Sequence, residues 1–367
     1  MDYNNYLNPT LVSVKPSGIR KFFSIAEEMD DVISLGVGEP DFKTPWHIRQ
    51  TGINSLEQGA TRYTANAGLI LLRNEIANYY KRRFNVNYSA DDEIMVTVGG
   101  SEGIDMAIRS LVCPGDEVLV VEPSFVCYKP IIEICGGVAV PIVTENKNNF
   151  KLMPEEIENA VTDKTKLIVL PFPNNPTGAV MRRADLEKIA EVIKKHDLFV
   201  LSDEIYCELT YGNEKHTTIA SLDGMQERTI VINGFSKTYS MTGWRLGYAL
   251  GPAPVIKQMT KLHQYAIMSA PTTSQYAAVE ALRNGDEDIK KMRDDYDMRR
   301  RFTVNAFREI GLDCFEPEGA FYVFPCIKST GLSSEDFCER LIMAKHVAVK
   351  DLYVYLIAIL LIILRKR

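Results

Sequence analysis

A lysine and an arginine, eight residues apart, lie in the stretch of the chain best suited to chemistry. This stretch reads TIVINGFSKTYSMTGWRLGYALG and runs from Thr229 to Gly251, with Lys237 beside Ser236 and Arg245 downstream. Its β-branched beginning predicts a buried parallel strand that ends just before the lysine. An amine there can form an imine with an aldehyde, and a guanidinium can hold a phosphate through two hydrogen bonds. A surface loop with ordinary basic residues is the alternative.

Three other predicted strands also end in residues that can bind a ligand. Gly100 and Ser101 follow one strand and open a helix, so that backbone N–H groups and the helix dipole offer an anion site. Asn175 lies in a sharp turn after a second strand, and Asp203 and Tyr206 follow a third. Tight turns, helix caps and a buried, hydrogen-bonded aspartate are the structural alternatives. The ends of parallel strands meet at one edge of a sheet, where open α/β sheets bind ligands.

The elements that must position these residues alternate between strands and helices. Apolar runs predict strands at Ile94–Val98, Glu117–Val121, Val138–Val143, Leu167–Leu170, Phe199–Leu201, Thr229–Asn233 and Leu246–Leu250. Helical patterns lie at Ile19–Met29, Pro45–Gln58, Gly68–Phe84, Glu102–Leu111, Tyr128–Cys135, Asp185–Lys195, within 252–310 and at Ser333–Ala344. This alternation predicts an α/β fold with a mostly parallel, seven-stranded sheet between helices.

The patterns divide the chain into four segments. Residues 46–285 hold the alternating strands and helices and form the large domain. We expect residues 1–45 and 286–349 to form a smaller α+β domain together. Residues 350–367 are a strongly apolar tail of unusual composition.

Composition limits the classes of function. The chain carries 42 lysines and arginines against 48 acidic residues, a net charge of −6, and its basic residues are scattered, which argues against nucleic-acid binding. The seven cysteines form no C-x-x-C pair and the five histidines lack ligand spacing, so we expect neither disulfides nor a metal. Without a secretory signal at its start, the chain is expected in the cytoplasm and not in a membrane.

Five motifs resemble those of one enzyme family. GVGEPDF, PNNPTG, SDEIY, GFSKTYSMTGWRLGY and PEGAFYVFP are similar to motifs of the fold-type I, class I/II pyridoxal-phosphate aminotransferases. The motifs follow the family's order, and the resemblance extends over nearly the whole chain, from about Ser17 to Val349. The resemblance implies an enzyme that uses pyridoxal 5′-phosphate to move an amino group from an L-amino acid to a 2-oxo acid.

The resemblance places five residues around the cofactor ring. Lys237 would form the imine with the cofactor's aldehyde and then move the substrate proton, which requires a neutral amine. Asp203 would pair with the pyridinium nitrogen and so maintain the ring as an electron sink. Tyr206 and Asn175 would donate hydrogen bonds to the 3′ oxygen. Phe125 would stack on the ring (Tyr128 is the weaker candidate), with core packing as the alternative.

The resemblance also implies a phosphate site that two subunits share. The backbone amides of Gly100 and Ser101 would hold the phosphate together with Ser236 and Arg245. Tyr63, in the TRYT segment, would reach the phosphate of the neighbouring subunit, which implies a homodimer.

Three residues are implied on the substrate side, one of which is Asn175, which would also bind the cofactor. The backbone of Gly38 would meet the substrate carboxylate, and Ile19 would cover the entrance, with core packing as its alternative. The substrate side chain itself is left open, because a difference of one methylene is worth only about 1–3 kcal/mol.

After Val349 the chain departs from the family pattern. The family continues into a proline-glycine loop and an R-x-S-Y strand, whose arginine binds the substrate's α-carboxylate. Here the chain reads KDLYVYLIAILLIILRKR, and neither Arg365 nor Arg367 stands in that motif. As a helix, the thirteen apolar residues of Leu352–Leu364 would reach about 20 Å, against a hydrocarbon core of about 30 Å. A buried helix, a strand or an aggregation-prone end is therefore expected.

A frameshift near Lys350 is our hypothesis for this departure. Read one base out of frame, permitted codons for the tail can encode EGFIRVSYCYSINHIEEA, which contains the missing R-x-S-Y strand. The chain as written would then bind the cofactor but bind amino acids poorly. A C–S β-lyase on the same fold and a catalytically weak, cofactor-binding paralogue are the alternative functions.

Overall fold

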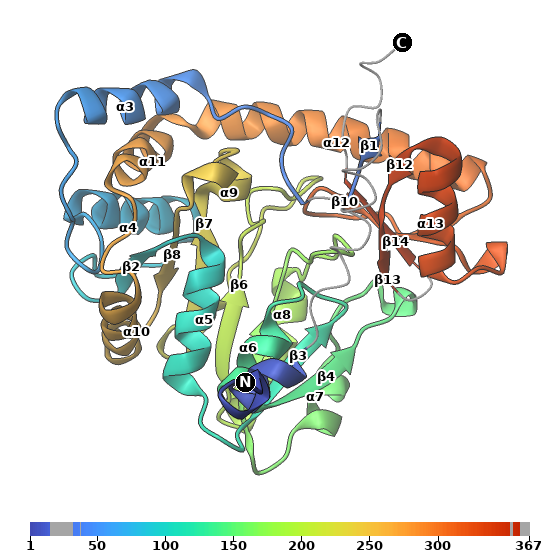
Figure 1. Cartoon of the computed structure of the whole chain (residues 1–367), viewed down its shortest axis with the longest axis horizontal. Helices are drawn as coiled ribbons and strands as arrows, with labels where there is room; N and C mark the ends of the chain where they lie inside the picture. Colours follow the sequence, from blue (N-terminus) through green and yellow to red (C-terminus); the bar gives the residue numbers. More distant parts are fainter. Residues whose placement is uncertain (15–31, 37, 353–354, 360–367) are drawn as a thin grey trace.

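A seven-stranded sheet forms the centre of the protein (Figure 1). In the computed structural model, which describes residues 1–14, 32–36, 38–352 and 355–359, the strand order is β2-β8-β7-β6-β5-β3-β4. The strands are β2 (Ile94–Thr97), β3 (Glu117–Glu122), β4 (Val138–Val143), β5 (Thr165–Leu170), β6 (Phe199–Asp203), β7 (Thr229–Gly234) and β8 (Gly247–Leu250). Strand β8 runs opposite to the other six strands of this sheet. The prediction of a mostly parallel, seven-stranded sheet is confirmed.

Alternate residues of the strands enter two layers of helices, because successive side chains of a strand point to opposite faces. In β3, Val118 and Val120 pack with the layer of α5, α6 and α10, whereas Leu119 and Val121 pack with α7 and α8 on the other face. On that second face, α4 and α11 cover β2, β7 and β8, and α3 packs on α11. These helices are α3 (Trp46–Glu57), α4 (Ile70–Phe84), α5 (Gly100–Leu111), α6 (Tyr128–Ile134), α7 (Pro154–Ala160), α8 (Arg183–Lys195), α10 (Ala253–Ala266) and α11 (Thr272–Asn284).

A smaller unit lies at the far end of α12 (Asp286–Glu309), the long helix that crosses the top of Figure 1. Its sheet has the order β10-β14-β11-β9, with β13 paired to β14. Its elements are β9 (Asp313–Cys314), β10 (Tyr322–Val323), β11 (Pro325–Cys326), α13 (Ser334–Lys345), β12 (Val347–Ala348), β13 (Lys350–Leu352) and β14 (Tyr355–Ile359). The N-terminal strand β1 (Ile33–Ser34) joins β12 in parallel, so both ends of the chain contribute to this unit. The predicted domain boundaries stay a prediction.

The tail is a strand wherever the structure describes it. Residues Tyr355–Ile359 pair antiparallel with β10 and β11, with Ile359 opposite Tyr322 and Tyr355 opposite Cys326. Of the three structures expected for the tail, the strand is therefore found for these residues.

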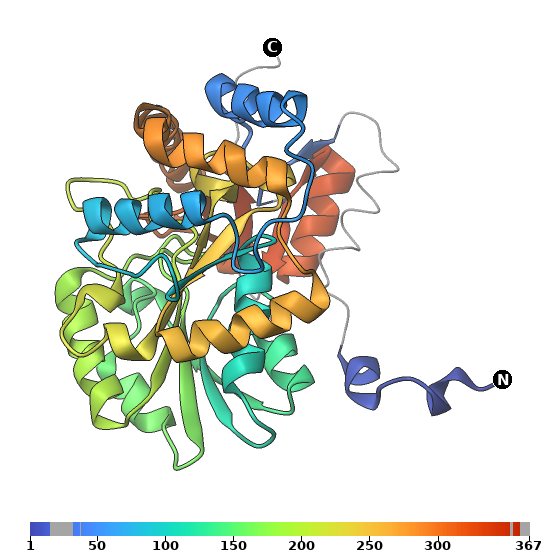
Figure 2. The same cartoon turned by 90° about the vertical axis from the view of Figure 1, so that its left-hand side faces the viewer.

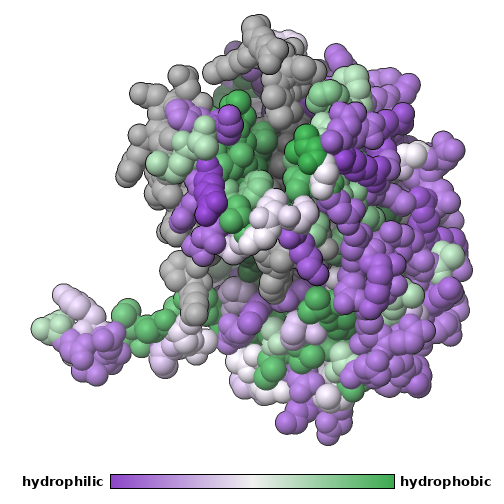
Figure 3. Space-filling model, turned by 90° about the vertical axis from the view of Figure 1, so that its right-hand side faces the viewer, coloured by the Kyte–Doolittle hydropathy of each residue, from purple (hydrophilic) through white to green (hydrophobic). Residues whose placement is uncertain are grey.

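The N-terminal residues project from the body as an arm (Figure 2). The arm holds the short helices η1 (Tyr3–Asn5) and α1 (Pro9–Ser13), and the side chains of Leu7, Leu11 and Val12 are exposed. Figure 3 shows hydrophobic residues at the surface of this arm. The predicted helix at Ile19–Met29 lies outside the described residues. Within the described ranges, no helix combines the length and apolar character needed to cross a bilayer.

Candidate active site

The predicted site residues come together at one cavity of about 470 Å³ at the carboxyl ends of β5, β6 and β7. This cavity is lined by Gly38, Gly100, Ser101, Phe125, Asn175, Asp203, Tyr206, Ser236, Lys237 and Arg245. Two predicted residues are not among them. Tyr63 is 81% exposed on the surface, and Ile19 lies outside the described residues.

The antiparallel strand β8 explains how Lys237 and Arg245 reach the same edge. Lys237 lies in the short helix α9 (Phe235–Thr238), which begins where β7 ends. The chain then turns through η5 (Thr242–Trp244) and returns as β8, so that Gly247 lies opposite Gly234. Residues just before β8 therefore lie beside residues just after β7.

The amine of Lys237 lies in a setting that favours its neutral form. Burial, aided by the charge of Arg245, lowers the pKa of Lys237 to about 8, although Glu39 and Asp203 act in the opposite direction. Lys237 Nζ donates a hydrogen bond to the carbonyl oxygen of Gly38 and lies 5.4 Å from the centre of the Phe321 ring. A free amine is therefore accessible near neutral pH.

Asp203 offers a buried carboxylate in the wall of the same cavity. Its Oδ2 accepts a hydrogen bond of 2.7 Å from the hydroxyl of Tyr128, and its Oδ1 accepts one of 3.2 Å from the Ile205 amide. Burial raises the pKa of Asp203, and the Tyr128 hydrogen bond opposes this effect. A protonated ring nitrogen would compensate the buried charge, so this residue fits a pyridinium partner.

The structure gives Tyr128 a part that its sequence position did not suggest. The family resemblance makes Tyr128 only the weaker candidate for stacking on the ring, whereas its buried hydroxyl contacts Asp203. Phe125 lines the cavity half-buried, and its ring centre lies 6.2 Å from that of Tyr128 with the planes at 84°. No local pattern could have revealed the Tyr128 contact, because Asp203 is 75 residues away.

The turn that carries Asn175 is held by its neighbour. Asn174 is buried, its Oδ1 accepts a 3.0 Å hydrogen bond from the Thr177 amide, and its Nδ2 donates to the carbonyl of Pro123 over 3.1 Å. Asn174 therefore fixes the backbone, while Asn175 lines the cavity.

The start of α5 and the guanidinium of Arg245 form an anion site. Gly99 precedes the helix with a φ of 79°, and a Cβ at Gly99 would lie 2.7 Å from Arg245 Nη2. The guanidinium therefore lies against the helix N-terminus, where backbone N–H groups and the helix dipole favour negative charge. Arg245 donates to the carbonyl of Thr242 over 3.0 Å, and it forms no ion pair with any carboxylate of the described residues.

These side chains and backbone amides match the functional groups of pyridoxal phosphate. The amine of Lys237 suits the aldehyde, the carboxylate of Asp203 suits the ring nitrogen, and the N-terminus of α5 with Arg245 suits the phosphate. The residues present therefore fit the cofactor that the sequence resemblance implies.

Comparisons with known proteins agree with this geometry. The family described as aminotransferase class I and II matches residues 30–357. The Bacillus subtilis protein YugH is 53% identical over 345 residues, 94% of this chain and 89% of that protein, and a Pyrococcus abyssi aspartate aminotransferase is 46% identical over 338 residues, 92% and 87%. The structure of a Pyrococcus horikoshii aromatic aminotransferase is similar with a TM-score of 0.88 and 40% identity, over 92% of this chain and 93% of that one. The chain belongs to the class I and II aminotransferases, transferases of fold type I that use pyridoxal 5′-phosphate.

Proposed function

We propose that this enzyme moves an amino group from an L-amino acid to a 2-oxo acid, with Lys237 as its catalytic base. The observation that carries the proposal is the amine of Lys237, whose pKa is lowered to about 8 in the same cavity as Asp203 and the N-terminus of α5. A base that works near neutral pH needs a pKa close to that pH, and burial supplies the shift.

Each residue then has a defined task. Bound pyridoxal phosphate supplies an aldehyde and a ring that accepts electrons. Lys237 would accept the proton that leaves the substrate's α carbon and would be the residue that passes it on. Asp203 would pair with the ring nitrogen, while Tyr206 and Asn175 would donate hydrogen bonds to the 3′ oxygen. Arg245 and the amides of Gly100 and Ser101, with Ser236, would bind the phosphate, and the backbone of Gly38 would meet the substrate carboxylate.

Borohydride reduction tests the role of Lys237 directly. Reduction of the cofactor-loaded protein should fix the cofactor to the peptide that contains Lys237, as read by mass spectrometry. Lys237→Ala should remove the label, and the exposed Lys261→Ala should retain it. A label on another peptide of the wild type would overturn the proposal.

A half-reaction screen with each amino acid would identify the substrate. The similar proteins do not decide it, because one is named for aspartate and another for aromatic amino acids.

We further propose that the chain as written turns over slowly because its tail lacks the carboxylate-binding arginine. Two observations support this: the cations among the described residues of the cavity are Lys237 and Arg245, and β14 carries the sequence YLIAI in place of an R-x-S-Y strand. Loss of one partner of a buried, hydrogen-bonded charge pair costs about 2–5 kcal/mol, or about 30- to 5,000-fold in rate.

Replacing residues 350–367 with EGFIRVSYCYSINHIEEA tests the tail. The replacement should raise the transamination rate by that factor while the cofactor absorbance stays the same. Near-normal turnover by the chain as written would contradict this proposal, and the gene sequence would decide the frameshift hypothesis independently.

We also propose a cytoplasmic homodimer. Tyr63, Tyr265 and Trp46 expose aromatic side chains at 81%, 84% and 59%, and exposed aromatic residues are enriched at protein interfaces. No disulfide joins the cysteines of the described residues, which suits a reducing compartment.

A further inference from the structure

Two tyrosine hydroxyls meet at the cavity, and the motifs suggested a role for only one of them. The hydroxyls of Tyr206 and Tyr322 lie 2.7 Å apart, and both side chains are buried in the cavity wall. Among the described residues, Tyr206 is the one hydrogen-bond partner of the Tyr322 hydroxyl. Burial raises the pKa of both, so each hydroxyl keeps its proton near neutral pH and can donate one hydrogen bond.

The position of Tyr322 is restricted from several sides. Its ring and that of Phe321 lie 5.7 Å and 5.4 Å from the ring of Tyr206, both in edge-on contact. A Cβ at Gly38 would collide with the Tyr322 hydroxyl, and the carbonyl of Gly38 accepts the hydrogen bond from Lys237. The Tyr322 hydroxyl is therefore confined between Tyr206 and the Gly38 backbone.

Backbone hydrogen bonds tie the segments of the two tyrosines together. The Tyr211 amide donates to the carbonyl of Glu318 over 2.8 Å, and the Ala320 amide donates to the carbonyl of Leu209 over 2.8 Å. The Gly319 amide also donates to the carbonyl of Gly178, just beyond the Asn175 turn, over 2.9 Å. The chain before Tyr322 is thus attached to the chain after Tyr206.

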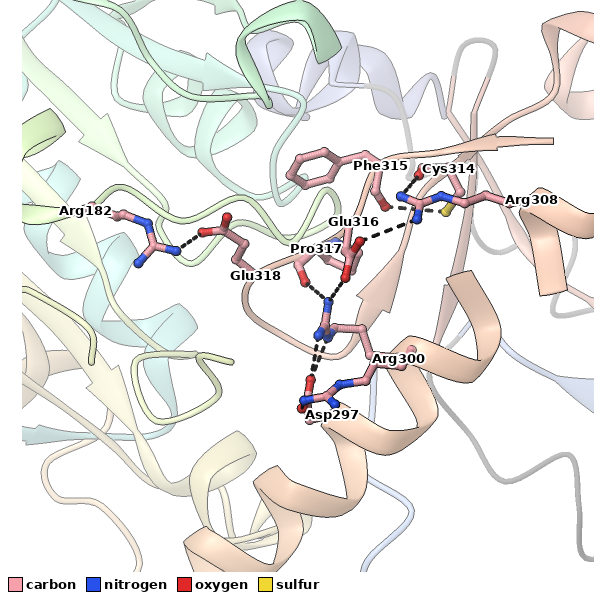
Figure 4. Close-up of polar contacts among 10 residues, drawn as sticks. Arg182, Asp297, Arg300, Arg308, Cys314, Phe315, Glu316, Pro317 and Glu318 are labelled. Atoms are coloured by element: carbon pink, nitrogen blue, oxygen red, sulfur yellow. Dashed lines mark hydrogen bonds and ion pairs between the residues drawn. The ribbon is translucent and has the colours of Figure 1, made fainter. Parts of the chain in front are cut away.

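Three arginines hold the same segment from the side of α12 and α8 (Figure 4). Arg300 donates to Glu316 over 3.0 Å and to the carbonyl of Pro317 over 3.2 Å, and its other edge pairs with Asp297. Arg182 pairs with Glu318 over 2.7 Å, and Arg308 donates to the carbonyl of Cys314 over 3.1 Å. Because each arginine pairs with a carboxylate, the cluster serves to fix residues 314–318 more than to attract an anion.

The aberrant tail completes this support. Tyr322 is the first residue of β10, and β14 pairs with it through Ile359 and Ala358. Although the sequence departs from the family pattern after Val349, β14 still pairs with β10, the strand that contains Tyr322.

We propose that Tyr322 is a positioning residue that acts through Tyr206. Its hydroxyl orients the Tyr206 hydroxyl toward the cofactor's 3′ oxygen and does not itself bind the substrate. This inference rests on the proposed function. A hydroxyl that receives a hydrogen bond becomes a stronger donor, because chains of hydrogen bonds polarise one another. Tyr322 donating to Tyr206 therefore strengthens the bond from Tyr206 to the 3′ oxygen. Without Tyr322 the anionic form of that oxygen would be less stabilised, so the bound cofactor would lose its proton at a higher pH.

The measurement is the midpoint pH of the visible absorbance of the cofactor-loaded enzyme. Tyr322→Phe should raise this midpoint by about half a pH unit, the size expected for one weakened neutral hydrogen bond. Tyr206→Phe should raise it further. In the double variant Tyr206→Phe/Tyr322→Phe, the midpoint should equal that of Tyr206→Phe alone, because Tyr322 would have no route to the cofactor.

Tyr211→Phe is the matched control. It removes a buried hydroxyl that donates to the carbonyl of Ala320, two residues from Tyr322, and it should leave the midpoint unchanged. A wild-type midpoint in Tyr322→Phe, or shifts that add in the double variant, would overturn the inference while the proposed function stands. A wild-type protein whose Lys237 captures no cofactor would instead contradict the proposed function.

Discussion

At the residue scale, the chemistry of Lys237 depends on what burial does to its charge. The pKa of Lys237 falls from an ordinary value of 10.5 to about 8 in the folded protein. Below pH 8 the buried amine is protonated, and it opposes folding because the charged form is poorly solvated. Above pH 10.5 the amine is neutral in both the folded and the unfolded chain, and the cost disappears. Between these values the unfolded chain binds more protons, so stability rises with pH.

The first prediction follows from this linkage. Lys237→Met should raise the free energy of unfolding of the cofactor-free protein at pH 7 by about 3 kcal/mol, which corresponds to the shift in pKa. The advantage should shrink as the pH rises from 8 and vanish near pH 10.5. Denaturant unfolding at several pH values measures it, with the exposed Lys261→Met as the control. A constant difference between pH 7 and 10.5 would mean that the amine is not buried in its charged form.

At the scale of elements, the phosphate site depends on the close approach of β8 to the start of α5. A Cβ at Gly247 would lie 2.5 Å from the carbonyl carbon of Gly99 and 2.6 Å from the amide nitrogen of Gly100. The carboxylate of Glu102, in the first turn of α5, accepts hydrogen bonds from the Val98 amide and from His263 Nδ1, and so holds the helix start in place.

The second prediction is that Gly247→Ala weakens cofactor binding. The added methyl group must push the backbone of Gly99 and Gly100 away from the phosphate, and overpacking of this kind costs about 1–3 kcal/mol. Cofactor affinity, measured by absorbance titration, should fall by about 5- to 150-fold. Gly243→Ala is the matched control in the same connection, because its Cβ would meet no atom within 4 Å. Equal affinities for the two variants would contradict the role assigned to this contact.

At the scale of the whole molecule, the small sheet depends on the last described strand. β14 lies between β10 and β11, so that its removal would leave β10 without its partner and β11 paired with β9 alone. The tail strand β14 thus pairs with β10, and β10 contains Tyr322, which lines the active-site cavity.

The third prediction concerns this strand. A chain that ends at Val349 should show fast amide hydrogen exchange in β10, because unpaired backbone groups open locally at little cost. The change in β11 should be smaller, because β11 keeps its pairing with β9. Strands β5, β6 and β7 should retain their protection, since their pairing does not involve the small sheet. Exchange measured by mass spectrometry on the full and shortened chains would show the difference. Unchanged protection of β10 would show that β14 does not support it.

The fourth prediction tests the proposed homodimer. Lys237→Ala and Tyr63→Ala chains should each bind the cofactor weakly, the first without its amine and the second without the tyrosine on the partner's phosphate. Dissociating and reassociating a mixture should produce hybrid dimers in which one site has both residues and regains wild-type cofactor affinity. Absorbance titration detects this recovery. Affinities that stay at the average of the two separate variants would contradict a site shared between subunits.

The sequence by itself determined the sheet, the order of the strand ends and the ring of residues at their edge. It could do so because each of these is local: an apolar run forms a strand, and the polar residues directly after it lie at the sheet's edge. Lys237, Asp203, Asn175 and Arg245 are all found at one cavity for that reason.

Only the tertiary structure decided what surrounds these residues. The contacts of Tyr128 with Asp203 and of Tyr322 with Tyr206 join positions 75 and 116 residues apart, and no local pattern encodes them. The lowered pKa of Lys237 and the pairing of the tail with β10 likewise depend on which distant segments exclude water and complete the hydrogen bonds. Strand ends are set by neighbours in the chain, whereas burial and partnership are set by neighbours in space.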